Sequence, residues 1–164
     1  MVKSRNPGAQ LTALPGWPTV AIVGRPNVGK SSLFNAILGR RVAIVHEESG
    51  VTRDRIAAVA EWGRRKFQVV DTGGLGVYAG ETRQVDRWTA AIGEQVAAAI
   101  AGADVLVMVV DAMAGRIPLD EEIAGRLRGC GKPVLLALNK ADNPALEEEA
   151  GGEFAKLGLA PAFP

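Results

Sequence analysis

The sequence predicts a single α/β domain in which a mostly parallel sheet is flanked by helices. From about Thr19 onward, short β-branched runs alternate with amphipathic segments of helical length, which is typical of parallel strands joined by crossover helices. The chain has 164 residues, enough for one domain with a substantial core. Its 48% apolar and 23% charged residues are typical of globular proteins. We therefore expect one domain over residues 19–164, preceded by a flexible leader at 1–18.

Five strands are predicted along the chain. Three runs are apolar on both faces, as expected for interior strands of a parallel sheet: 20–23, 105–110 and 134–138. Two more, 56–62 and 66–70, flank a short Gly-Arg turn and predict a hairpin, so one edge of the sheet is expected to be antiparallel. Helices are expected at 31–38, about 86–101, 120–128 and 144–157.

Charge and composition exclude several classes of protein. The 19 Lys and Arg nearly balance the 18 Asp and Glu, which argues against a polybasic nucleic-acid wrapper. Apolar runs are far shorter than the roughly 18 residues of a membrane helix, so we expect no membrane association. Pro7 and Pro15 interrupt the segment where a secretory signal would be apolar, and Cys130 is the single cysteine. These features predict a cytoplasmic protein.

A phosphate-binding loop follows the first predicted strand. Residues 24–31 read Gly-Arg-Pro-Asn-Val-Gly-Lys-Ser and match Gly-x-x-x-x-Gly-Lys-Ser/Thr between a strand and a helix. The glycines allow backbone N–H groups to turn inward around phosphate oxygens, and the helix N-terminus adds its positive dipole end. Lys30 is placed to bridge the β- and γ-phosphates and Ser31 to ligate Mg²⁺. The loop predicts a nucleoside triphosphate ligand.

Two predicted strands end in an aspartate, and we assign the metal site to the first of them. Asp71 is followed by Thr-Gly-Gly, and the amide of Gly74 can approach a γ-phosphate with no side chain in the way. Asp111 is interpreted as a turn or cap residue.

A base-recognition motif follows the strand at 134–138. Asn139, Lys140 and Asp142 form Asn-Lys-x-Asp at the carboxyl edge of the sheet, where open α/β sheets bind ligands. The Asp142 carboxylate can accept hydrogen bonds from the ring N–H and the exocyclic amine of guanine. Adenine would leave this carboxylate unpaired, which can lower affinity by about 10⁴-fold or more. The motif therefore predicts guanine specificity.

With these three motifs in order, the chain resembles the translation-factor class of P-loop GTPases and, more narrowly, the first G domain of the double-Era (Der/EngA) family. Further motifs that carry the resemblance are Ser-Gly-Val-Thr-Arg-Asp-Arg at 49–55 and Asp-Glu-Glu-Ile-Ala at 120–124. Era and the tRNA-modifying MnmE G domain share the first motifs. The resemblance implies a P-loop GTPase fold whose last strand and closing helix would follow Pro164, so that both are missing from this chain.

The resemblance also implies site residues and partners. It makes Thr52 the switch threonine that ligates Mg²⁺, and Asn27 a ligand of K⁺. The predicted catalytic residues are Lys30, Asn27, Thr52 and Gly74; the metal ligands are Ser31, Thr52 and Asp71; the nucleotide-binding residues are Gly24, Asn27, Val28, Gly29, Lys30, Ser31, Ser32, Asp71, Gly74, Asn139, Lys140 and Asp142. The implied partners are GTP or GDP, the large ribosomal subunit or rRNA, a second G domain and a C-terminal RNA-binding-type domain.

Two functions remain open at this point. One is GTP hydrolysis during assembly of the large ribosomal subunit. The other is a GTP-dependent binding switch with negligible turnover, or a related Era- or MnmE-type GTPase that acts on RNA. Leu75 favours slow turnover, because Ras-type enzymes have there a glutamine that orients water. The basic groups Arg40-Arg41 and Arg64-Arg65-Lys66 fit either RNA phosphates or an ordinary solvated surface.

Overall fold

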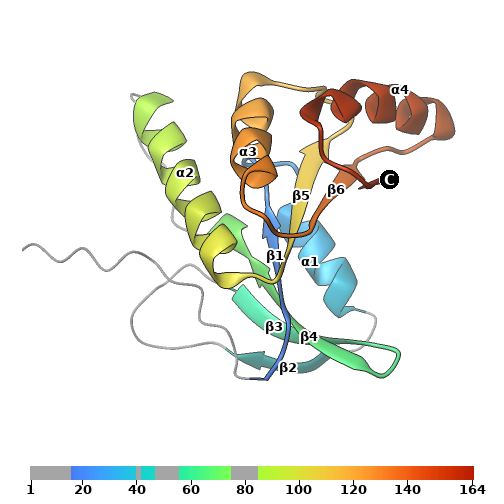
Figure 1. The fold of residues 1–164 in the computed structure, drawn as a ribbon. Coiled ribbons are helices and arrows are strands. Elements are labelled where there is room, and N and C mark those ends of the chain that lie inside the picture. The colour runs from blue at the N-terminus through green and yellow to red at the C-terminus, as the bar shows by residue number, and fades with distance from the viewer. Residues whose placement is uncertain (1–15, 40–41, 47–55, 75–84) are drawn as a thin grey trace, which may run out of the picture.

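A mixed sheet with helices on both faces forms the domain (Figure 1). The computed structural model describes residues 16–39, 42–46, 56–74 and 85–164. The strands are β1 (Thr19–Val23), β2 (Val42–His46), β3 (Ile56–Trp62), β4 (Arg65–Asp71), β5 (Val105–Asp111), β6 (Val134–Asn139) and β7 (Ala162–Phe163). The helices are α1 (Lys30–Leu38), α2 (Val85–Gly102), α3 (Pro118–Arg128) and α4 (Pro144–Phe154), with short 3₁₀ turns η1 (Thr72–Gly74) and η2 (Ala155–Leu157).

The order of strands places the carboxyl ends of β1, β4, β5 and β6 at one edge. The sheet runs β2-β3-β4-β1-β5-β6-β7, and neighbours from β4 to β7 are parallel. β3 is antiparallel to both β2 and β4, which confirms the predicted hairpin and the antiparallel edge. The segments that follow β1, β4, β5 and β6 therefore meet at one end of the sheet.

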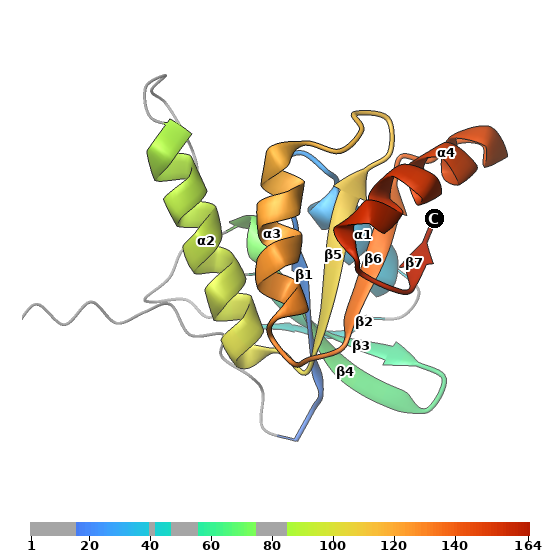
Figure 2. The ribbon, with the colours of Figure 1, turned by 45° about the horizontal axis from the view of Figure 1, so that its top comes forward.

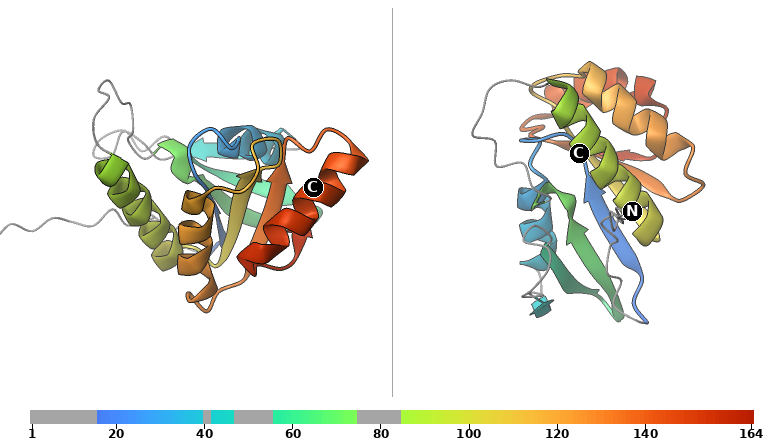
Figure 3. Two further views of the ribbon diagram at one scale, coloured as in Figure 1. Left: turned by 90° about the horizontal axis from the view of Figure 1, so that it is seen from above. Right: turned by 90° about the vertical axis from the view of Figure 1, so that its left-hand side faces the viewer.

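Two apolar clusters hold the layers together. On one face, α1 packs Phe34 and Leu38 against strand residues that include Ile22. On the opposite face, α2, α3 and α4 cover the sheet and contribute buried residues such as Phe154 (Figure 3). Successive residues of β1 point to alternate faces, and both faces are covered, so the strand must be apolar throughout. This explains the unbroken run that the sequence showed at 20–23.

The predicted helices are confirmed to within a few residues. α3 begins at Pro118, slightly before the predicted start at Asp120, because proline suits the first turn of a helix. The last predicted helix divides into α4 and the η2 turn. Asn143 caps α4, and its side-chain Oδ1 accepts a hydrogen bond from the backbone N–H of Leu146 at 2.9 Å.

Both outer strands of the sheet differ from the prediction. β2 was not expected as a strand; it pairs with β3, which supplies the hydrogen bonds that so short a run needs. The edge strand expected only beyond Pro164 has its first residues inside the chain, since Ala162 and Phe163 pair with β6. This corrects the expectation that the last strand is entirely missing.

Two residues of the predicted leader contact β4. The carbonyl of Pro18 accepts a hydrogen bond from the backbone N–H of Gln68 at 2.8 Å, and the ammonium of Lys66 lies 5.5 Å from the centre of the Trp17 ring. Residues 1–15 of the leader lie outside the described residues. Within the described part of the chain, no helix combines the length and apolar character needed to cross a bilayer.

Candidate nucleotide-binding site

The predicted phosphate loop joins β1 to α1, and its backbone requires glycine at two positions. Gly24 has a φ of 149°, and a Cβ there would lie 2.5 Å from the carbonyl oxygen of Val109. Gly29 has a φ of 95°, and its Cβ would lie 2.0 Å from Nδ2 of Asn139. Both conformations are strained for L side chains, and both distances are shorter than any real contact. The glycines therefore allow the loop to pack directly against β5 and the base-recognition loop.

Lys30 is the first residue of α1, and its side chain folds back into the phosphate loop that precedes the helix. Its ammonium donates hydrogen bonds to the carbonyls of Gly24 at 2.9 Å and Arg25 at 2.8 Å. Burial lowers the pKa of Lys30 from its usual 10.5, nearby Asp71 opposes this shift, and Arg25 adds to it. A cation held at this place, among inward-facing backbone groups, suits the charge of a phosphate chain.

Ser31 and Asp71 lie side by side although they are far apart in the sequence. The Ser31 hydroxyl donates to Oδ2 of Asp71 at 2.7 Å, and Oδ1 of the same carboxylate accepts from the N–H of Gly73 at 2.7 Å. A hydroxyl and a carboxylate are the hard oxygen ligands that Mg²⁺ prefers. The described residues hold no group of three or more His, Cys, Asp or Glu side chains able to bind a metal. Two protein oxygens fit a metal ion that takes its other ligands from phosphates and water.

The segment after Asp71 is fixed by a residue that sequence reasoning did not select. The Thr72 hydroxyl is buried and donates to the carbonyl of Ile22 in β1 at 2.7 Å. This bond ties η1, which contains the predicted phosphate contact Gly74, to the strand that feeds the phosphate loop. Thr72 stands inside the Asp-x-x-Gly motif, so the signal for it was present. Thr52 and Leu75 lie outside the described residues.

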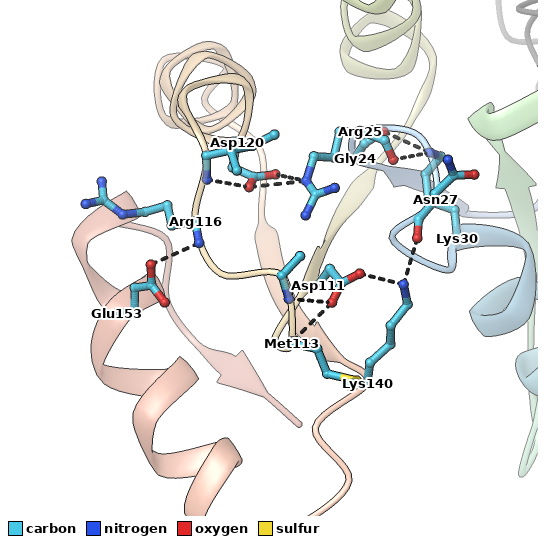
Figure 4. Close-up of polar contacts among 12 residues, drawn as sticks. Gly24, Arg25, Asn27, Lys30, Asp111, Met113, Arg116, Asp120, Lys140 and Glu153 are labelled. Carbon is cyan, nitrogen blue, oxygen red and sulfur yellow. Dashed lines mark hydrogen bonds and ion pairs between the residues drawn. The ribbon is translucent and has the colours of Figure 1, made fainter.

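The base-recognition loop is bound directly to the phosphate loop (Figure 4). The ammonium of Lys140 donates to the carbonyl of Asn27 at 2.9 Å. Nδ2 of Asn139 also donates to the carbonyl of Val28 at 2.8 Å. Asn27 and Lys140 both have positive φ, 65° and 63°, so both loops turn sharply where they meet. Asp142 follows in the same loop and is exposed. Two of the three base-motif side chains thus join the loops, and the third faces solvent.

Asp111 has a wider role than the turn cap that the sequence predicted. Its Oδ1 accepts from the N–H groups of Met113 and Ala114, both at 3.0 Å, which confirms the cap. Its Oδ2 forms an ion pair with Lys140. Burial raises the pKa of Asp111, but hydrogen bonds from Lys140 and the two backbone amides outweigh burial and hold it below its usual 3.8. Asp111 therefore stays ionised and orients Lys140 toward the phosphate loop.

Val28 and Ser32 complete the set of predicted site residues that the structure describes. The side chain of Val28 is fully buried, and its carbonyl accepts the hydrogen bond from Asn139. Ser32 is exposed in the first turn of α1. The structure thus gathers Gly24, Asn27, Val28, Gly29, Lys30, Ser31, Ser32, Asp71, Gly74, Asn139, Lys140 and Asp142 at the carboxyl edge of the sheet. Cys130 lies in the turn between α3 and β6.

We predict that Gly29→Ala weakens GDP binding at least about 10-fold and destabilises the fold by about 1–3 kcal/mol, the usual cost of a strained backbone position. The added methyl group would overlap the side-chain amide of Asn139 and displace it. Titration of fluorescent GDP and thermal unfolding measure the two effects. Gly125→Ala is the control, because Gly125 is exposed in α3, and its Cβ would meet only the Arg128 side chain at 3.7 Å. Equal affinities for the two variants would contradict the close fit of the loops.

Comparisons with known proteins show the family of this chain. Residues 19–140 match the family described as 50S ribosome-binding GTPase. The chain is 51% identical over 143 residues to GTPase Der of Myxococcus xanthus, covering 87% of this chain and 30% of that protein. It is 46% identical over 149 residues to GTPase Der of Brevibacillus brevis, covering 91% and 33% respectively. The chain therefore spans about a third of the length of these relatives.

Solved structures of GTPases share the fold of this chain. Aquifex aeolicus Era bound to GDP and AlF₄⁻ superposes with a TM-score of 0.61 at 31% identity, covering 89% of this chain and 50% of that one. Era in complex with MgGDPNP and nucleotides of 16S ribosomal RNA also gives 0.61, at 30% identity, covering 90% and 50%. The fold is that of the P-loop GTPases, and the chain belongs to the 50S ribosome-binding GTPase family.

Proposed function

We propose that this domain binds GTP with Mg²⁺ and hydrolyses it to GDP and phosphate. The observation that carries the proposal is the pair of hydrogen bonds from Asn139 and Lys140 to the carbonyls of Val28 and Asn27. These bonds fix a base-recognition loop beside a phosphate loop, and they leave Asp142 exposed for a ligand. One ligand that joins a purine to a phosphate chain can span both loops.

In this proposal the loop residues divide the work of holding the nucleotide. Backbone N–H groups of the phosphate loop, including those of Gly29 and Ser32, surround the phosphates, and Lys30 contributes its positive charge. Ser31, Asp71 and Thr52 hold the metal, and the Gly74 amide contacts the γ-phosphate. When bound, Mg²⁺ would neutralise charge on the β- and γ-phosphates. The Ser31–Asp71 hydrogen bond supports this assignment, because it brings two oxygen ligands together.

The first test is base selectivity. Wild-type protein should bind GDP and GTP at least about 10⁴-fold more tightly than ATP, because adenine leaves the Asp142 carboxylate unpaired. Asp142→Asn should lose guanine affinity and gain affinity for xanthosine diphosphate, since the new amide N–H can donate to the carbonyl oxygen that replaces the guanine amine. Competition against fluorescent GDP measures both.

Glu148→Gln, which neutralises an exposed carboxylate on α4, is the matched control and should bind GDP as the wild type does. ATP that competes as well as GTP would overturn the proposed nucleotide. An unchanged base preference in Asp142→Asn would remove Asp142 from the site.

Hydrolysis would proceed by attack of water, with catalysis by positioning and electrostatics. Leu75 cannot hydrogen-bond to the water, so another group must supply this function. We assign the compensating charge to a potassium ion held with help from Asn27, a cation that would offset negative charge in the transition state. Asn27 supports this role by its place: it is exposed at the tip of the phosphate loop, and its own carbonyl is held by Lys140.

We expect GTP hydrolysis to be at least about 10-fold faster in potassium than in sodium buffer. Removing a group that stabilises transition-state charge slows other enzymes by at least this factor. Asn27→Gly removes the side chain but permits the positive φ of this position, so it should abolish the difference between the cations. Asn35→Gly on the exposed side of α1 controls for loss of an amide elsewhere. Phosphate release measures the rates, and equal wild-type rates in the two buffers would refute the potassium assignment.

The second candidate function is a GTP-dependent binding switch with negligible turnover of its own. Leu75 favours it, for the reason given above. Phosphate release with and without large ribosomal subunits separates the candidates. A switch would bind subunits in the GTP state without releasing phosphate, whereas the proposed enzyme releases it in either condition.

The cellular role that we propose is assembly of the large ribosomal subunit, which would place the protein in the cytoplasm. The family description and the Der relatives support it. Because the chain spans about a third of those relatives, we also assign a second G domain and a C-terminal RNA-binding-type domain to the whole protein.

A basic hairpin supports direct contact with RNA. The β3–β4 turn extends away from the helices in Figures 1 and 2. At its end Trp62 is 70% exposed and lies opposite Arg65, and Arg64 and Lys66 are also exposed. Lys66 is 4.0 Å from Glu61, but neither arginine has an ion-pair partner among the residues described. An exposed indole stacks on unpaired bases, and free arginines bind phosphates.

We predict that the triple variant Trp62→Ala, Arg64→Gln, Arg65→Gln binds single-stranded rRNA fragments at least about 10-fold more weakly, because base stacking alone is worth about 1–3 kcal/mol. The slope of log affinity against log salt should fall by about 1.4, for two phosphate contacts. Filter binding across salt concentrations measures both. The variant Arg126→Gln, Lys156→Gln removes the same charge from α3 and η2, and a similar loss there would show that the hairpin is not the contact.

A further inference from the structure

One side chain of the phosphate loop contacts α3 and not the ligand side of the loop. Arg25 extends from the loop to the first turn of α3, where its Nε lies 3.3 Å from Oδ1 of Asp120 and 3.4 Å from Oδ2 (Figure 4). The Arg25 side chain is 13% exposed and that of Asp120 is 0% exposed. This ion pair is therefore largely shielded from water, unlike the exposed pair of Arg126 and Glu122 on the same helix.

Asp120 is itself fixed in position. Its Oδ2 accepts a hydrogen bond from the N–H of Ile117 at 3.1 Å, which closes the first turn of α3. Ile123 and Leu127, on the same helix, are buried in the core between α3 and the sheet. The carboxylate that Arg25 reaches is thus attached to a rigid part of the domain.

The backbone of Arg25 belongs to the binding machinery. Its carbonyl accepts a hydrogen bond from the Lys30 ammonium at 2.8 Å. On the other side of Pro26, the Asn27 carbonyl is held by Lys140. The residues on either side of Pro26 are thus held from different sides: α3 holds the Arg25 side chain, and the base-recognition loop holds the Asn27 carbonyl.

Stability alone is a poor explanation for this ion pair. Removing two charges from water costs about as much as their attraction returns, so buried pairs contribute little net stability. Nη2 of Arg25 is buried with no hydrogen-bond partner in the structure, which adds to that cost. Burial raises the pKa of Asp120 above its usual 3.8 despite the Ile117 amide and Arg25, which shows that ionisation of this carboxyl is disfavoured where it lies. Because the ion pair contributes little net stability, its position beside the phosphate loop points to a role in the binding site.

We infer that Arg25 and Asp120 are a positioning pair that holds the phosphate loop in its binding conformation before nucleotide arrives. Without the pair, the loop would have to become ordered when it binds phosphate, and this ordering would reduce affinity. The inference rests on the proposed binding of GTP and GDP.

A double-mutant cycle on nucleotide dissociation tests the inference. Arg25→Gln removes the charge at similar length, and Asp120→Asn keeps an oxygen acceptor for the Ile117 amide, so α3 can still begin normally. We expect each variant to raise the dissociation rate of fluorescent GDP about 10-fold, and the double variant to be no faster than either, because all three lose one contact. The matched cycle of Arg126→Gln and Glu122→Gln should leave the rate within about 2-fold of wild type, as for an exposed pair.

The melting temperature of the nucleotide-free protein separates positioning from stability. A merely structural pair would lower the melting temperature and leave GDP dissociation unchanged, and this result would overturn the inference. Rate effects that multiply in the double variant would also overturn it. If Asp120→Asn does not fold, Arg25→Gln and Arg25→Lys still decide the matter, since neither touches the α3 cap. Wild-type protein that binds no GDP would instead reject the proposed function.

Discussion

The site depends on the hydrogen bond between the Asn139 amide and the Val28 carbonyl. It joins the loop after β6 to the loop after β1, two segments that lie far apart in the sequence and at the same edge of the sheet. The bond can form only because residue 29 is glycine, since any Cβ would occupy the position of the amide. In the proposed nucleotide site, this bond sets the distance between the purine and its phosphates. Base selectivity and phosphate affinity, as we propose them, therefore depend on this contact as well as on the two motifs.

Around that bond, side chains satisfy backbone carbonyls that the sharp turns of the loops leave unpaired. Lys30 serves two carbonyls of the phosphate loop, Lys140 serves a third and Asn139 a fourth. The carbonyls bonded by Lys30 and Asn139 are buried or partly buried, where a carbonyl without a partner is costly, so these two side chains stabilise the loop. The carboxylates Asp71 and Asp111 then orient Ser31 and Lys140. The site is therefore a hydrogen-bond network in which most side chains hold another residue of the site in position.

The sequence allowed the fold class, the four helices and five of the strands to be predicted, because long apolar runs and capped helices carry strong local signals. The placement of the site motifs at one edge of the sheet was also predictable, since each motif directly follows a parallel strand. The contacts between motifs were not predictable. The reach of Arg25 to Asp120 and of Thr72 to Ile22 depends on how strands and helices pack, and no periodicity in the sequence encodes it. β2 and β7 were missed because short edge strands take their stability from the neighbouring strand.

Val28 has a consequence for the dynamics of the loop. Its backbone faces the base-recognition loop, while its side chain is completely buried in the cluster that α1 forms with the sheet. A loop anchored in this way cannot melt by itself as ordinary surface loops do, because releasing it would expose part of the core. Its amide hydrogens would exchange with solvent only through openings that involve the α1 layer. The turn at Val28 thus belongs to the same cooperative unfolding unit as the centre of the sheet.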